Sequence, residues 1–122
     1  MGPLCLIVMP APLSVRRVRA AVRGHLAARG LTTHSTTAEL LASELVTNAL
    51  RHAPGSIRLS LSIQRGAIHC EVQDTNPTAP TVRRAQYGDE GGRGMLLVQQ
   101  LAREWGSRAS GRGKAVWFDL EL

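Results

Sequence analysis

Aromatic residues are scarce in this chain of 122 residues, at 3% of the sequence. The core must therefore be built from aliphatic side chains, and no aromatic side chains interleave with basic ones to stack on nucleic-acid bases. The two cysteines lack CxxC spacing, which argues against a metal site and indicates reduced, buried thiols. The apolar run near the start is too short to span a bilayer, and no basic segment precedes it. We expect a cytoplasmic protein that binds neither membrane nor nucleic acid directly.

Positive charge is abundant by contrast. The formal net charge is +6, and 14 of the 15 basic residues are arginine. Such a charge suits an anionic partner, such as a nucleotide phosphate or an acidic protein face, although the arginines are dispersed enough to form only a solvated surface. With 43% hydrophobic and 20% charged residues, the chain is typical of a globular protein, and its length predicts a single domain over residues 1–122.

Hydrophobic periodicity predicts helices that alternate with antiparallel hairpins. Ser14 is expected to cap the first helix, and Thr36 with Glu39 forms a capping-box pattern at the second. Residues 75–91 lack a core pattern and indicate a loop. The order predicts an α+β two-layer sandwich, with one mixed, mostly antiparallel sheet and helices on one face. The expected strands are 4–9, 56–63, 68–72, 105–109 and 115–122, and the expected helices are 14–29, 36–53 and 95–102.

The stretch ELVTNALRHA carries three polar residues four positions apart: Glu44, Asn48 and His52. On a helix with about 100° per residue they form a strip beside the apolar face, where they could line a cleft between the helix and the sheet. Ordinary surface polar residues are the alternative. Asparagine in mid-helix is harder to explain this way, because it is a poor helix former.

Two later segments could complete a site with this strip. Asp74 shares the inward row of the strand over 68–72, where a carboxylate is costly unless something pairs with it. A ligand amine is one candidate, and a turn capped by the carboxylate is the alternative. The stretch EGGRGMLLV, residues 90–98, places glycines just before an expected helix, which suits close approach to an anion but also an ordinary flexible loop.

These signals together resemble the GHKL (Bergerat-fold) ATPase family, most closely the bacterial anti-sigma-factor serine/threonine kinases and their short actinobacterial relatives. SELVTNALRHA, EGGRGMLLVQQLA and GKAVWFDL carry the resemblance, which covers nearly the whole chain. It implies an ATP-binding domain that requires Mg²⁺ and forms a homodimer. It also implies a regulator that sequesters a sigma factor and phosphorylates an anti-anti-sigma antagonist.

The resemblance also implies residue roles. Asn48 would ligate Mg²⁺, Glu44 would act as general base, and His52 would help hold phosphate. Asp74 would accept a hydrogen bond from the adenine amine. The remaining cofactor-binding residues would be the lid residues Gly92, Arg93 and Gly94.

Three departures from the family pattern stand in the sequence. No glycine follows Asp74 in the DTNPT segment where the family has DxGxG. Lys114 follows Gly113 where a hydroxyl is expected, and Glu90 stands where some kinases carry a cation. A non-catalytic binding module that acts by protein contact alone is therefore the alternative function, and a small nucleic-acid-binding protein is a third.

Overall fold

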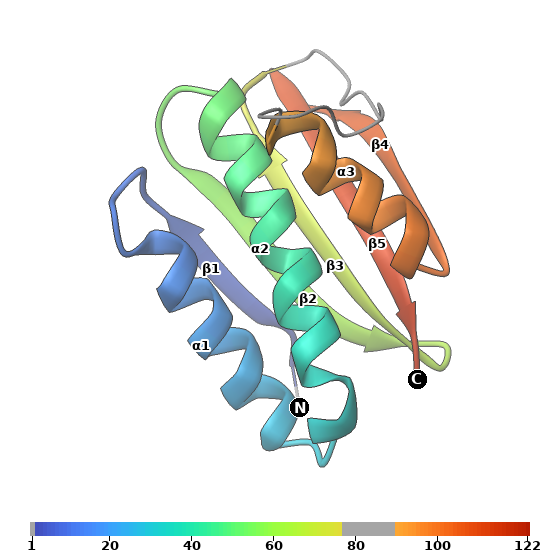
Figure 1. Cartoon of the computed structure of the whole chain (residues 1–122). Coiled ribbons are helices and arrows are strands. Elements are labelled where there is room, and N and C mark those ends of the chain that lie inside the picture. The colour runs from blue at the N-terminus through green and yellow to red at the C-terminus, as the bar shows by residue number, and fades with distance from the viewer. Residues whose placement is uncertain (1, 77–89) are drawn as a thin grey trace.

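The structure, a computed structural model, describes residues 2–76 and 90–122, and for residues 90–94 it describes the backbone only. Within these residues the strands form one sheet in the order β1-β2-β3-β5-β4, and every pairing is antiparallel. The helices α1, α2 and α3 lie side by side on one face of this sheet (Figure 1). The predicted two-layer α+β class is thus confirmed. The elements are β1 (Leu4–Val8), α1 (Ser14–Ala27), the 3₁₀ turn η1 (Thr32–His34), α2 (Ser35–His52), β2 (Ile57–Gln64), β3 (Ala67–Asp74), α3 (Glu90–Leu101), β4 (Glu104–Ser110) and β5 (Gly113–Glu121).

The core lies between the two layers, as the periodicity of the sequence predicts. Alternate residues of each strand point toward the helices, because successive side chains of a strand face opposite ways. Phe118 of β5, the chain's one phenylalanine, is fully buried among aliphatic side chains. The inward rows include Ile57, Leu59 and Leu61 of β2, Ile68, Cys70 and Val72 of β3, and Val116, Phe118 and Leu120 of β5.

The helix starts differ from the sequence-based expectation. Ser14 is the first residue of α1, and its hydroxyl accepts from the Ala11 amide and donates to the Met9 carbonyl. It therefore closes the preceding turn and leaves the helix amides uncapped. The capping box at Thr36 is also absent, because η1 leads directly into α2 and Glu39 accepts instead from the Ser35 hydroxyl at 2.6 Å.

The third helix begins earlier than predicted, at Glu90, so the glycine-rich segment forms its first turns. Each glycine lowers helix stability by only about 1 kcal/mol. The apolar side chains of Met95 and Val98, both buried in the core, anchor the following turns. Residues 77–89 of the predicted loop lie outside the described residues.

The face of the sheet opposite the helices carries a chain of ionisable side chains. His69 lies between two carboxylates, with Nδ1 at 2.5 Å from Asp119 and Nε2 at 2.8 Å from Glu71, and its ring stacks on Trp117. Glu71 also accepts two hydrogen bonds from the Arg108 guanidinium, at 3.0 and 2.7 Å.

This arrangement shifts the pKa of His69 and the pKa of Glu71 in opposite directions. Partial burial alone lowers the pKa of His69, but hydrogen bonds to Glu71 and Asp119 and their negative charges outweigh it and raise the pKa above its usual value. The bidentate contact from Arg108 holds the pKa of Glu71 below its usual value. Folding therefore stabilises the protonated form of His69 relative to the unfolded chain.

Candidate functional site

One end of the sheet gathers four chain segments. The C-terminal end of α2, the end of β3, the start of β5 and the start of α3 all lie there (Figure 1). The sequence-predicted site residues belong to three of these segments. The fold therefore brings the polar strip, Asp74 and the glycine-rich turn to the same end of the molecule.

On α2, the polar strip borders the core as predicted. Glu44 and Asn48 are half-buried and His52 is exposed. Ser43, which faces α1 through a 3.0 Å hydrogen bond from Arg19, lies about 140° around the helix from Asn48. Since α3 flanks α2 on the other side (Figure 1), Asn48 borders the core on the α3 side. Within the described part of the chain, the side chains of Glu44 and Asn48 have no hydrogen-bond partner.

The segment that follows β3 is tied to the end of α2. The Asn76 side chain donates to the His52 carbonyl at 2.6 Å, and the Thr75 hydroxyl donates to the Pro54 carbonyl at 3.3 Å. These bonds hold the residues after Asp74 in place without the glycines that the family pattern has there. They also fix the distance between the α2 strip and the end of β3.

Asp74 points inward and is buried, as its strand parity predicts. Its partner is a residue of the chain itself: the Lys114 ammonium lies 3.0 Å from Oδ2 and 3.3 Å from Oδ1. The carboxylate also accepts from the Asn76 amide at 2.8 Å, so the turn-capping alternative holds as well. The side chains of Lys114 and Asp74 are 4% and 1% exposed. The charge on each is balanced by the other.

Gly113 is the residue that lets β5 come this close to β3. A Cβ atom at this position would lie 1.9 Å from the Asp74 carbonyl oxygen and 2.6 Å from the Thr75 Cα. Both are backbone atoms, so no side-chain rotation could relieve the clash. The glycine therefore sets the position of Lys114 directly opposite Asp74.

Lys114 is the site residue that sequence reasoning missed. The sequence showed it only as a departure from an expected hydroxyl. A signal was nevertheless present, because Lys114 shares the parity of the inward residues Val116 and Phe118, just as Asp74 shares that of Val72. Two inward charges of opposite sign at one end of a sheet indicate a pair.

The start of α3 is the third segment of the candidate site, after the α2 strip and Asp74. Gly92, Arg93 and Gly94 lie in the first turns of this helix. Free backbone N–H groups and the helix dipole make such a terminus suitable for an anion, and glycine lets the anion approach closely. In a helix that begins at Glu90, the N–H of Gly92 lacks a helical acceptor and could meet an anion, whereas the N–H of Gly94 donates to the Glu90 carbonyl.

The donor set suits a nucleotide-bound magnesium ion better than a metal held by protein alone. Among the described residues, no group of three or more His, Cys, Asp and Glu side chains could hold a metal. Mg²⁺ in nucleotide sites uses one or two protein oxygens besides phosphates and water. The half-buried amide of Asn48, with no partner among the described residues, meets that requirement.

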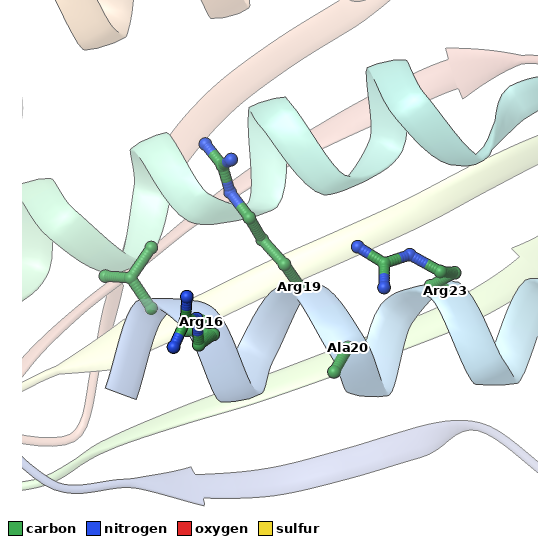
Figure 2. Close-up of a pocket in the computed structure, with 5 residues that line it drawn as sticks. Arg16, Arg19, Ala20 and Arg23 are labelled. Atoms are coloured by element: carbon green, nitrogen blue, oxygen red, sulfur yellow. The ribbon is translucent and has the colours of Figure 1, made fainter. Parts of the chain in front are cut away.

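A hollow lies on the surface of α1, away from the site at the sheet end. Val15, Arg16, Arg19, Ala20 and Arg23 line it, and Figure 2 shows the guanidinium groups of Arg16, Arg19 and Arg23 arrayed along the helix. Arg23 pairs with Glu39 of α2 at 2.7 Å. In the described part of the chain, Arg16 has no acidic partner. The hollow is a basic surface distinct from the site at the sheet end.

Comparisons with known proteins agree with this geometry. The family described as the histidine kinase-like ATPase domain matches residues 8–120. A crystal structure of the RsbU and RsbW domains of Rv1364c from Mycobacterium tuberculosis superposes with a TM-score of 0.76 at 20% identity, covering 100% of this chain and 33% of that one. The present chain thus spans about a third of that protein. No curated protein sequence matches. None of the helices in the described residues is long and apolar enough to cross a membrane.

Proposed function

Because the chain belongs to the histidine kinase-like ATPase domain family, we propose that it is an ATP-binding anti-sigma regulator in the cytoplasm. It sequesters a sigma factor and phosphorylates an anti-anti-sigma antagonist on serine or threonine. The observation that carries the proposal is the family match over residues 8–120, and its support is the gathering of the α2 strip, Asp74 and the α3 start at one end of the sheet. The fold shared with a structure that contains an RsbW domain agrees with it.

In this proposal each segment has a separate task. The amide oxygen of Asn48 ligates Mg²⁺, which neutralises phosphate charge when bound. Glu44, one turn earlier on α2, accepts the proton of the attacking hydroxyl. His52 assists in holding phosphate, and the free backbone N–H groups at the start of α3, that of Gly92 among them, receive the terminal phosphates. Arg93 adds positive charge, and Gly94 has no side chain to obstruct the approach.

The first test is nucleotide binding measured by calorimetry with ATP and ADP in the presence of Mg²⁺. Asn48→Ala should weaken Mg²⁺-dependent binding at least tenfold, because it removes the proposed protein ligand. Thr47→Ala, on the same helix but outside the strip, is the matched control and should bind as the wild type does. The absence of nucleotide binding in the folded wild type would refute the proposal.

The second test separates catalysis from binding. Glu44→Gln should abolish phosphoryl transfer from labelled ATP to the anti-anti-sigma protein while ATP affinity stays within about twofold. Glu104→Gln makes the same chemical change at an exposed carboxylate of β4 and should leave transfer intact. Transfer that survives Glu44→Gln would remove this residue from the catalytic role.

A non-catalytic binding module is the second candidate, and one observation favours it. The proposed adenine-reading carboxylate of Asp74 is already engaged by Lys114 at 3.0 Å. A regulator that acts by contact alone should bind its sigma factor with equal affinity with and without ATP. A kinase-type regulator should show partner affinity that depends on nucleotide.

The basic surface of α1 is the proposed contact with a protein partner. Arg16 is exposed and lines the hollow together with Arg19 and Arg23, so an acidic partner face would complement this surface (Figure 2). The next residue along α1, Arg17, is also exposed and adds positive charge. Charge reversal at both positions, Arg16→Glu with Arg17→Glu, should slow association with the partner more than it speeds dissociation. Unchanged association in stopped-flow measurements at low salt would exclude this surface.

Homodimerisation is proposed through the edge strand β1. This strand lies at the edge of the sheet, and Ile7 and Met9 are 62% and 58% exposed beside it. An exposed apolar edge strand favours pairing with a second copy. Light scattering of wild type and Ile7→Lys should show a dimer that the substitution dissociates.

A further inference from the structure

The chain's single lysine is buried against the carboxylate proposed to read the base. The Lys114 ammonium has three hydrogens and three acceptors in reach: the two oxygens of Asp74, at 3.0 and 3.3 Å, and the Asn76 carbonyl at 3.0 Å. All its hydrogen-bonding capacity is therefore used inside the protein.

A base amino group that donates to Asp74 would have to compete with this ammonium. The carboxylate already accepts from Lys114 through both oxygens and from the Asn76 amide through Oδ1. Its side chain is 1% exposed, so an incoming amine could reach it only by displacing Lys114. A displaced ammonium would leave a charge without a partner in a site with little water, which is costly. The competition favours the internal pair.

We propose that Lys114 is a specificity-determining residue that takes the place of a base amino group on Asp74. The site then holds a purine nucleotide through its phosphates and leaves the amino group of the base unread. This inference rests on the proposed nucleotide-binding function. It predicts that the site binds purine nucleoside triphosphates with similar affinity whether or not the base carries an amino group. Gly113 supports it, because no other residue allows β5 to bring Lys114 opposite Asp74.

The test compares two nucleotides that differ only in the amino group. ATP and purine riboside 5′-triphosphate, each with Mg²⁺, are titrated into the wild type by calorimetry. Affinities within about twofold of each other are expected. A hydrogen bond to a charged group changes affinity by roughly ten- to a hundredfold, so a carboxylate that reads the amine would favour ATP by at least about tenfold. That preference in the wild type would overturn the inference and leave the proposed function standing.

Variants sharpen the comparison. Lys114→Thr frees a carboxylate oxygen and should create an ATP preference of about tenfold or more over the amine-free nucleotide. Arg112→Thr removes the same charge from an exposed residue two positions earlier and should not. Adding Asp74→Asn to Lys114→Thr should abolish the gained preference. Circular dichroism checks the fold of each variant, and if Lys114→Thr does not fold, the wild-type comparison decides alone.

Failure of the inference can be told from failure of the underlying function. Wild type and Lys114→Thr that are both folded and bind neither nucleotide at millimolar concentration would overturn the nucleotide site and this inference with it. A Lys114→Thr variant that binds both nucleotides equally would overturn only the role of Lys114.

Discussion

Asp74→Asn and Lys114→Met each leave one charge of the buried pair between β3 and β5 without its partner. The two side chains are 1% and 4% exposed, so the remaining charge cannot be hydrated without local opening. Removing one partner of a buried ion pair costs about 3–5 kcal/mol. With an unfolding entropy of about 2.1 cal/mol/K for each of 122 residues, this cost lowers Tm by about 12–20 °C.

The double variant is the decisive part of this experiment. With both substitutions no charge is left behind, so its loss of stability should be smaller than the sum of the two single losses by about 2 kcal/mol or more. Urea unfolding followed by circular dichroism gives each value. Arg23→Met, which breaks the exposed pair with Glu39, is the control and should cost less than about 1 kcal/mol. Single variants that melt within about 4 °C of the wild type, or strictly additive losses, would refute the reasoning.

Three further expectations concern other parts of the fold. Gly113→Ala should destabilise the protein by about 3 kcal/mol or more, because its Cβ would lie 1.9 Å from a backbone oxygen. Gly24→Ala, in α1 with open space around it, should instead raise Tm slightly. His69 has a raised pKa in the folded state, so its stabilising contribution is present below pH 6.5 and lost as pH rises through the folded value. His69→Gln should flatten this decline in urea unfolding between pH 6 and 8.5, and an unchanged decline would contradict the assignment. The expectation of two buried thiols holds for Cys70 but was wrong for Cys5, which is exposed. Burial raises the pKa of Cys70, so a thiol reagent should modify Cys5 alone in the native protein and both cysteines after denaturation.

The features that could be predicted from the sequence are those set by local repetition. The alternation of Ile57, Leu59 and Leu61 with polar residues predicts which face of β2 is buried, since a strand has a period of two. Ile63, at the end of the same row, is 38% exposed. The positive φ of Arg65 and Gly66 confirms the tight turn predicted between β2 and β3. The same periodicity placed Asp74 on the inward row.

The features that could not be predicted depend on residues far apart in the chain. Whether Asp74 meets a ligand or a lysine depends on the pairing of β3 with β5, and the register of that pairing is set across about 40 residues rather than by a turn. The predicted helix starts were wrong for a different reason. The hydroxyl of Ser14 can bond either to helix amides or to the preceding turn, and only the path of the chain after β1 decides between them.

The pairing of β3 with β5 joins two halves that are each local in sequence, one ending in the β2–β3 hairpin and the other in the β4–β5 hairpin. Several polar contacts cross this seam: Asp74 with Lys114, His69 with Asp119, Glu71 with Arg108, and Gln73 with Ser110. A slip of one residue would turn Lys114 to the open face and separate every one of these partners. These polar contacts therefore specify the register in which the two hairpins dock, because only one register satisfies all of them.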